Sequence, residues 1–384
     1  MTRVVVDGAC WSNPRGFGRF TRELVSALAR RSEGFQYTLV LEAAAPRWPV
    51  PAGIDVVEAG LGPTGEAVAA GGARGLPHLL RMGRAIAARQ PELVFFPASY
   101  SWVPAPTRAP QVVTIHDAIP ERFPRLIFPR RRNHLLWRAK GWLARATSTR
   151  VLTVSQAARD DLVSILGVPP ERIDVTSEAA DPVFAPRDVD RRAVLSRHGL
   201  DPALPAVLYV GGFNAHKNVL ALVDAAAALE TSVSLVLAGD TSGGGFYDNL
   251  PAIRERLARH PELERRVAFP GWLADDDLVD LYNAAVCLVL PSLAEGFGLP
   301  VAEAMACGCP VVCSDRTSLP EVAGGAALLV DPESPTEIGA ALGRVLAEPD
   351  LRESLRDRGL TRAAALTWDA AAAGAEACFR RALA

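Results

Sequence analysis

The feature that most constrains the fold is a regular alternation of short apolar runs with longer segments of helical periodicity. Seven runs occur in the first half of the chain, at 3–6, 37–41, 54–57, 93–97, 112–115, 151–154 and 172–176. Helical stretches lie between several of them, at 20–31, 79–89 and 131–147. Strands that are apolar along their whole length and separated by helices are typical of a parallel sheet covered on both faces.

The second half repeats this alternation. Its apolar runs lie at 206–210, 234–239, 266–271, 286–292, 310–314 and 326–330. Between the halves, residues 181–205 are rich in Pro, Asp and Arg, and a chain of 384 residues exceeds one ordinary core. We therefore predict an α/β protein with two doubly wound, Rossmann-like domains, 1–184 and 185–366. A closing Ala-rich helix within 367–384 is predicted to pack back toward the first domain. Two such domains would bind ligands in the cleft between the carboxyl ends of their strands.

Composition excludes several classes of protein. The formal net charge of −2 argues against a nucleic-acid partner. No window approaches eighteen apolar residues, and the first residues contain no signal-peptide core, so neither a spanning helix nor a targeting segment is predicted. Of six cysteines, Cys307, Cys309 and Cys313 are closely spaced, but they form no C-x-x-C pair and have no His nearby. Buried, reduced thiols in a cytoplasmic protein fit them better.

The stretch from Pro291 to Val312 contains two glutamates in an otherwise apolar or small-residue environment. Its strand passes through Glu295-Gly296-Phe297-Gly298 into a helix that starts at Leu299 or Pro300. Glycines at such a turn let backbone N–H groups approach an anion, and the helix N-terminus adds partial positive charge. Because carboxylates repel an anion, Glu295 and Glu303 are better suited to accept hydrogen bonds from sugar or ribose hydroxyls.

This stretch resembles the E-x7-E signature of the retaining glycosyltransferases of family four, which have the GT-B fold. Other segments resemble that family in the same order along nearly the whole chain. They are NPRGFGRFTREL (13–24), VVTIHDAIPERFP (112–124), LTVSQAARDDLVSILGVPPERIDV (152–175), LYVGGFNAHKN (208–218), SLPEVAGGAALLVDP (318–332) and LTWDAA (366–371).

The resemblance implies a role for each matching residue in the second domain. Glu295 would bind hydroxyls of the donor sugar, and Glu303 would bind the ribose of its nucleotide. Lys217 would pair with the diphosphate and stabilise the leaving nucleoside diphosphate. The base would stack near residues 269–272. The backbone around the sugar and diphosphate would be that of Gly212, Gly296, Phe297, Gly298 and Leu299.

The first domain would contribute three residues. Gly16 and Gly18 would line the cleft, and His116 would sit beside the reacting carbon. As a pattern, Gly16 and Gly18 do not form a dinucleotide fingerprint, because G-x-G-x-x-G is incomplete at Thr21.

The chain departs from the family in its cationic contacts. Many relatives carry an arginine shortly after the strand that precedes the lysine, and here Gly212 or Phe213 occupies that region. Arg19 or His216 could replace this second phosphate contact, and the sequence does not decide between them. The family hinge is also altered, because residues 178–181 keep only Asp181.

A basic, aromatic segment spans residues 122–150. One interpretation is an ordinary amphipathic helix whose Leu135, Leu136, Trp137 and Trp142 face the core. The other is a surface that seats an anionic acceptor or makes a peripheral contact with the inner membrane face.

The resemblance implies retaining transfer of a hexosyl group from a nucleotide-diphosphate sugar to a hydroxyl group. The donor would be GDP-mannose or a UDP- or dTDP-sugar, and the acceptor a glycan, a lipid or a small molecule. In the family, acceptor choice depends on variable loops such as 60–78 and 98–110. Neither a cofactor nor a metal is expected, and the oligomeric state is left open. A GT-B epimerase or glycoside phosphorylase is the alternative enzyme, and a non-catalytic nucleotide-sugar-binding partner is a third class.

Overall fold

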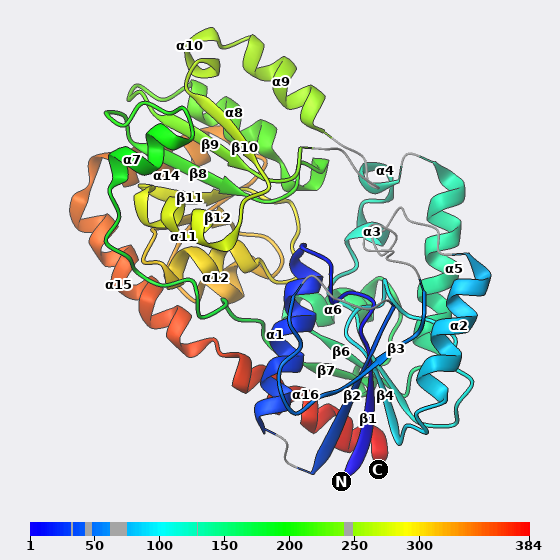
Figure 1. Ribbon diagram of the computed structural model, residues 1–384. Helices are drawn as coiled ribbons and strands as arrows, with labels where there is room; N and C mark the ends of the chain where they lie inside the picture. The colour runs from blue at the N-terminus through cyan, green and yellow to red at the C-terminus, as the bar shows by residue number, and fades with distance from the viewer. Residues whose placement is uncertain (32–33, 43–47, 62–74, 129, 242–248) are drawn as a thin grey trace.

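The computed structural model describes residues 1–31, 34–42, 48–61, 75–128, 130–241 and 249–384, and it consists of two lobes (Figure 1). The first lobe contains a seven-stranded sheet in the order β3-β2-β1-β4-β5-β6-β7. Its strands are β1 (Thr2–Asp7), β2 (Phe35–Leu41), β3 (Asp55–Glu58), β4 (Leu93–Phe96), β5 (Gln111–Thr114), β6 (Arg150–Thr153) and β7 (Ile173–Val175). All neighbouring strands pair in parallel.

The second lobe contains a six-stranded parallel sheet in the order β10-β9-β8-β11-β12-β13. Its strands are β8 (Ala206–Val210), β9 (Ser234–Ala238), β10 (Val267–Gly271), β11 (Cys287–Leu290), β12 (Val311–Ser314) and β13 (Leu328–Val330). Every predicted apolar run corresponds to one strand. The prediction of two doubly wound parallel sheets is confirmed.

Helices cover both faces of each sheet. Those of the first lobe are α1 (Gly16–Arg31), α2 (Leu76–Ala87), α3 (Ile119–Arg122), α4 (Pro124–Ile127), α5 (Arg131–Thr147), α6 (Gln156–Ser164) and the 3-10 turn η1 (Pro170–Arg172). Those that follow are α7 (Arg191–Arg197), η2 (Ala215–Lys217), α8 (Val219–Ala227), α9 (Leu250–Ala258), α10 (Pro261–Glu264), α11 (Asp275–Ala284), α12 (Leu299–Ala306), α13 (Leu319–Ala323), α14 (Pro335–Ala347), α15 (Pro349–Ala365) and α16 (Trp368–Leu383).

Alternate residues of the inner strands of the first lobe enter different cores. Val4 and Val6 of β1 join the core beneath α1, whereas Val5 joins the core that contains Met82 of α2 and Leu162 of α6. This alternation follows from the two-residue period of a strand and explains why strands buried on both faces are apolar throughout.

The last helix returns to the first lobe (Figure 1). Helix α16 packs against α1 and lies near β4, β5, β6 and β7. Phe379 of α16 packs edge-on against Phe35, with ring centroids 5.9 Å apart. Thr176 donates a hydrogen bond to the carbonyl of Ala371 over 2.8 Å. The C-terminal segment therefore ties the two lobes together.

The strand order reverses between β1 and β4 in the first sheet and between β8 and β11 in the second. In open α/β sheets, ligands bind beyond the carboxyl ends of the strands at such a reversal. The loops after β1, β8 and β11 carry the Gly16 segment, Lys217 and Glu295, and the loop after β5 carries His116. The topology therefore brings these segments to the space between the lobes.

Two local features differ from the sequence interpretation. Helix α7 lies within the region interpreted as a linker, because a helix of seven residues is too short to give a clear period. The expectation that Leu135, Leu136 and Trp142 face the core is wrong: their exposed fractions are 64%, 67% and 61%. Helical periodicity identifies a face but not what covers it.

Part of two predicted regions lies outside the described residues, namely 62–74 of the loop 60–78 and position 129 of the segment 122–150. In the part of the chain that is described, none of the helices has both the length and the apolar composition needed to cross a membrane. All six cysteines are buried, and none of them forms a disulfide bond. Burial raises the pKa of the Cys287 and Cys313 thiols to about 12, so these thiols are neutral core side chains.

Candidate active site

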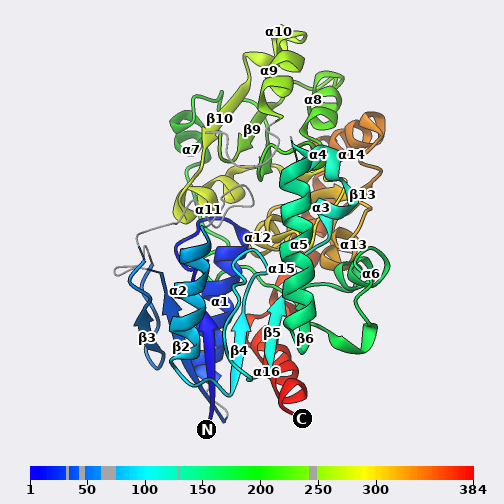
Figure 2. The ribbon, with the colours of Figure 1, turned by 90° about the vertical axis from the view of Figure 1, so that its right-hand side faces the viewer.

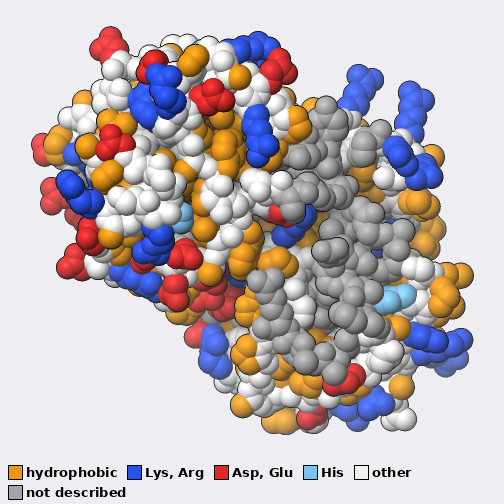
Figure 3. Space-filling view, turned by 45° about the horizontal axis from the view of Figure 1, so that its top comes forward, with side chains coloured by type: hydrophobic (Ala, Val, Ile, Leu, Met, Phe, Trp, Pro, Cys, Tyr) orange, Lys and Arg blue, Asp and Glu red, His pale blue; other side chains and the backbone are white. Residues whose placement is uncertain are grey.

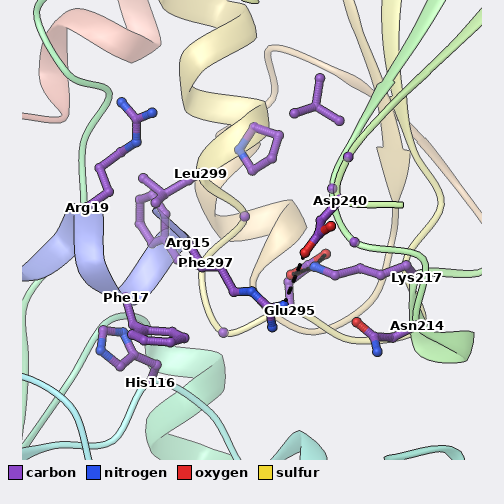
Figure 4. Close-up of a pocket in the computed structure, with 18 of the residues that line it drawn as sticks. Arg15, Phe17, Arg19, His116, Asn214, Lys217, Asp240, Glu295, Phe297 and Leu299 are labelled. Carbon is purple, nitrogen blue, oxygen red and sulfur yellow. Dashed lines mark hydrogen bonds and ion pairs between the residues drawn. The ribbon is translucent and has the colours of Figure 1, made fainter. Parts of the chain in front are cut away.

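A pocket of about 440 Å³ lies between the two lobes, and Figure 4 shows some of the residues that line it. Both lobes contribute to its wall. The lining contains all but one of the predicted site residues, namely Gly16, His116, Gly212, Lys217, Glu295, Gly296, Phe297, Gly298, Leu299 and Glu303. Gly18 does not line the pocket. It is buried in the first turn of α1, where a Cβ would lie 2.0 Å from the carbonyl oxygen of Asn13.

Glu295 and Lys217 form an ion pair at the centre of the pocket (Figure 4). The Lys217 Nζ lies 2.7 and 2.8 Å from the two carboxylate oxygens of Glu295. Ser292 donates a further hydrogen bond of 2.7 Å to Glu295. Burial by itself would raise the pKa of Glu295, but Lys217 and these hydrogen bonds bring that pKa below its ordinary value. Glu295 is therefore a carboxylate, able to accept hydrogen bonds.

Lys217 is positioned by the turn that follows it. Asn218 adopts the left-handed conformation, with φ of 56°, between η2 and α8. Its side-chain amide donates to the carbonyls of Pro291, over 3.2 Å, and Pro332, over 2.6 Å. These bonds fix η2 against the segment after β11. Lys217 and Glu295, separated by 78 residues in the chain, therefore share one edge of the second sheet.

Glu303 lies one turn into α12 and is buried. Tyr282 donates to one carboxylate oxygen of Glu303 over 3.1 Å, and the Arg19 guanidinium lies 3.6 Å from the other. Burial raises the pKa of Glu303, while Arg19 and Tyr282 act against that shift. Glu303 therefore belongs to a cluster of polar side chains from both lobes, and it lines the pocket.

Arg19 is the cation of that cluster. Besides Glu303, it forms ion pairs with Asp275 and with Asp181, the latter at 3.9 Å. Burial lowers the pKa of Arg19, but the carboxylates of Glu303 and Asp275 more than offset this effect. Figure 4 shows the Arg19 side chain on the far side of Leu299 from Lys217. Its charge is therefore balanced by carboxylates from the second lobe and the connecting segment.

His116 lies beneath α1, in edge contact with the Phe20 ring at a centroid distance of 4.6 Å. Its Nδ1 is 3.3 Å from a carboxylate oxygen of Glu178, and its Nε2 is 3.1 Å from the Pro97 carbonyl oxygen. Both ring nitrogens therefore face oxygen atoms of the protein. This arrangement fixes the ring plane and suits positioning better than proton transfer.

Gly296 lies where the two lobes meet. A Cβ at this position would lie 2.4 Å from the carbonyl oxygen of His116, so any larger residue would push the lobes apart. Ser155 from the first lobe also donates to the Gly296 carbonyl over 2.7 Å. Two residues further on, Gly298 precedes the first turn of α12, whose N-terminus opens toward the pocket. This end supplies unpaired backbone donors and partial positive charge.

His216 lines the pocket beside Lys217 and is buried. Burial, together with the neighbouring Lys217, lowers the pKa of His216 from 6.5 to about 4. The imidazole is therefore neutral at neutral pH. Of the two residues that the sequence offered as a second phosphate-binding cation, His216 lacks the charge.

The lowered pKa of His216 predicts a loss of stability in acid. Below pH 6.5 the unfolded chain takes up a proton that the folded imidazole binds only near pH 4, so stability falls as the pH decreases through this window. From about pH 7 to about pH 5, this group should lower the free energy of unfolding by about 2 kcal/mol. Urea unfolding of the wild type and His216→Gln checks this. The variant should lose less stability over the interval, and equal losses would contradict the assignment.

Arg15 is a site residue that sequence reasoning missed. It lies in the loop before α1, and its guanidinium extends into the pocket toward Glu295 and Lys217 (Figure 4). It forms an ion pair of 3.4 Å with Asp240 of the second lobe, and about two-fifths of each side chain is exposed. Arg15 is thus more weakly held than Arg19. Its position in the Gly-rich segment 13–24 was the only signal in the sequence.

The predicted base-stacking region is divided between two environments. Trp272 and its neighbour Gly271 line the pocket, and Trp272 is 48% exposed. Phe269 does not line the pocket. It packs against Phe213, with ring centroids 6.0 Å apart, under the guanidinium of Arg254. Stacking of a base in this region stays a prediction, and Trp272 is the aromatic side chain of residues 269–272 that lines the pocket.

Comparison with known families assigns both lobes. The family model described as Glycosyltransferase Family 4 matches residues 14–184, and the family model described as Glycosyl transferases group 1 matches residues 190–362. The chain belongs to glycosyltransferase family four. This family consists of retaining hexosyltransferases, and the resemblance predicted from the sequence is confirmed.

Two curated relatives illustrate the similarity within family four. O-antigen chain mannosyltransferase B of Escherichia coli is 37% identical over 222 residues, which cover 57% of each chain. D-inositol 3-phosphate glycosyltransferase of Rhodococcus jostii is 32% identical over 244 residues, or 62% of this chain and 53% of the relative. The matches thus span little more than half the length of these relatives.

Solved structures confirm the GT-B fold of this family-four chain. Sucrose-phosphate synthase from Thermosynechococcus elongatus superposes with a TM-score of 0.78 at 22% identity, covering 99% of both chains. The Anabaena protein HepE in complex with UDP-glucose gives a TM-score of 0.75 at 18% identity, covering 99% of this chain and 100% of that one.

Proposed function

We propose that the protein is a retaining glycosyltransferase that moves a hexosyl group from a nucleotide-diphosphate sugar to a hydroxyl acceptor. One observation carries the proposal: the pocket places the cation Lys217 and the hydroxyl-binding carboxylate Glu295 in contact. The N-terminus of α12 lies between Glu295 and Glu303 in the chain. The Lys217 cation and the α12 N-terminus suit a diphosphate, and the two carboxylates suit the hydroxyl-bearing rings on either side of it.

The diphosphate is assigned to Lys217, the α12 N-terminus and Arg15. Arg19 balances three carboxylates and His216 is neutral, so neither supplies a second available charge. Arg15 reaches the same region and leaves only a half-exposed partner, Asp240, when it turns to a phosphate. With this much fixed positive charge, the proposal requires no metal ion and no cofactor.

The two rings are assigned to the two glutamates. Glu295 accepts hydrogen bonds from hydroxyls of the donor sugar while Lys217 shifts toward the phosphate. Glu303 accepts a hydrogen bond from a ribose hydroxyl, in the position that Arg19 and Tyr282 approach. His116 borders the sugar, and Trp272 borders the base. The predicted roles of Gly16, Gly212 and residues 296–299 are to let the donor approach the backbone closely.

Among donors, the similarity to O-antigen chain mannosyltransferase B favours GDP-mannose. UDP-sugars and dTDP-sugars are the alternative donors, and the experiment below compares all three. The acceptor is a hydroxyl of a glycan, a lipid-linked saccharide or a small molecule.

Retention is assigned to a front-face reaction. In such a reaction the bond from the anomeric carbon to the diphosphate breaks as the acceptor oxygen bonds to the same face. The acceptor proton passes to the departing diphosphate, whose charge Lys217 and Arg15 neutralise. Glu295 is assigned to hydrogen bonds with hydroxyls of the donor sugar, and no covalent glycosyl-enzyme step is assigned to it.

The experiment is incubation of the purified chain with GDP-mannose, UDP-glucose or dTDP-glucose and a panel of sugar acceptors. Release of nucleoside diphosphate and a product that keeps the donor's anomeric configuration, seen by proton NMR, would support the proposal. Interconversion of sugar nucleotides without acceptor would favour the epimerase, and phosphate-dependent cleavage of a disaccharide the phosphorylase. Either outcome would overturn the transferase assignment.

A further inference from the structure

Helix α5 exposes an apolar face. Its seventeen residues bury only Ala144, whereas a helix on a globular protein usually buries a whole stripe. Leu135 and Leu136 are 64% and 67% exposed, and Trp142 and Leu143 are 61% and 43% exposed. The side chains that would anchor α5 to the sheet in an ordinary amphipathic helix therefore point to solvent.

The same helix begins with exposed arginines. Arg130, Arg131 and Arg132 stand at its N-terminus, where the helix dipole disfavours positive charge. None of these three arginines forms an ion pair with a described residue. No Asp or Glu occurs between Glu121 and Asp160. The three arginines therefore destabilise the N-terminus of α5, and binding of an external anion would offset this destabilisation.

Helix α2 extends this surface. Leu76 and Leu80 are 66% and 39% exposed, and the arginines at 81 and 84 are exposed beside them. The buried sides of α2 and α5 enter the same core of the first lobe, and both helices lie on one flank (Figures 1 and 2). Figure 3 shows basic side chains projecting near exposed apolar groups at this side of the molecule.

We propose that this docking face, the exposed residues of α5 with Arg130–Arg132 and the outer side of α2, binds an anionic lipid bilayer. Leucine and tryptophan side chains insert at the boundary between headgroups and acyl chains, and arginines pair with lipid phosphates. A single sign of charge spread over two helices complements a continuous anionic surface. A discrete protein interface would more often present both signs.

The docking face adjoins the pocket through the segment that precedes α5. Trp137, on the inner side of α5, packs against Tyr100 with ring centroids 5.2 Å apart, and Tyr100 lines the pocket. Ile127 of α4 lines the pocket as well. If the protein has the proposed function, docking on a bilayer would bring the pocket near lipid-linked acceptors and so favours that acceptor class. Only this step rests on the proposed function.

The test is co-sedimentation of the full chain with vesicles of phosphatidylcholine alone or with one-third phosphatidylglycerol. The wild type should bind the anionic vesicles, bind them less in high salt, and ignore the neutral ones. Two variants should reduce this binding at least tenfold: Leu135→Gln/Leu136→Gln/Trp142→Gln and Arg130→Gln/Arg131→Gln/Arg132→Gln. The control Arg192→Gln/Arg259→Gln/Arg265→Gln removes equal charge from exposed positions of the second lobe and should bind like the wild type.

Circular dichroism shows whether the variants fold, which is expected because the replaced side chains are exposed. Equal binding to neutral and anionic vesicles, or wild-type binding by both variants, would overturn the proposal. Absence of vesicle binding together with a concentration-dependent dimer that the apolar variant abolishes would identify a second copy as the occupant instead. Because no arm measures sugar transfer, the docking result stands apart from the proposed function.

Discussion

Lys217→Ala should lower kcat for glycosyl transfer at least tenfold, or about 1.4 kcal/mol in barrier height. Loss of one preorganised donor to a developing negative charge commonly costs roughly 100-fold, and we expect a value of that order. The reason is that the leaving diphosphate gains charge beside the Lys217 Nζ. Steady-state release of nucleoside diphosphate measures the effect, with the donor that the wild type uses in the donor panel of GDP-mannose, UDP-glucose and dTDP-glucose.

Lys217→Ala also removes the ion-pair partner of buried Glu295, so its effect on folding must be separated from its effect on chemistry. The double variant Lys217→Ala/Glu295→Gln removes the unpaired charge and should recover thermal stability without recovering turnover. Lys217→Arg keeps the charge and should retain more activity than Lys217→Ala. A folded Lys217→Ala protein with a near wild-type rate would refute the role assigned to the lysine.

The arrangement of strands could be predicted from the sequence because the central strands of each sheet are buried on both faces. Residues 4–6 and 112–113, for example, are valines on both faces of their strands, so the apolar pattern can be recognised without knowledge of the neighbouring strands. The same physics places Lys217 and Glu295 at carboxyl ends of adjacent strands. Their contact follows from topology, although 78 residues separate them.

Other parts of the site depend on how the lobes meet, which no local pattern encodes. Arg15 gains its place in the pocket from a partner 225 residues away, Asp240. Arg19 could be noticed as a cation, but its three carboxylate partners could not be foreseen. The exposed face of α5 was misjudged for a related reason: Leu135 and Trp142 have helical spacing whether a core or a membrane meets them.

Glu303→Ala should weaken binding of the nucleoside diphosphate at least tenfold. A hydrogen bond to a charged group contributes about 1.5–3 kcal/mol, and Glu303 is proposed to accept one from the ribose. The variant should bind the nucleoside diphosphate and its 2′,3′-dideoxy analogue equally, whereas the wild type should prefer the ribose form. Asp275→Asn is the matched control, because it also removes a carboxylate from Arg19 and should leave the ribose preference intact.

The central claim is that the pocket holds a nucleoside diphosphate between Lys217 and Glu303. Calorimetric titration of the wild type, Lys217→Ala and Glu303→Ala with the nucleoside diphosphate, its monophosphate and its dideoxy analogue tests this claim most directly. We expect Lys217→Ala to reduce the preference for diphosphate over monophosphate at least tenfold, because Arg15 and the α12 N-terminus remain, and Glu303→Ala to abolish the preference for ribose over dideoxyribose. Unchanged affinities in both variants, or no binding of GDP, UDP or dTDP to the wild type, would contradict it.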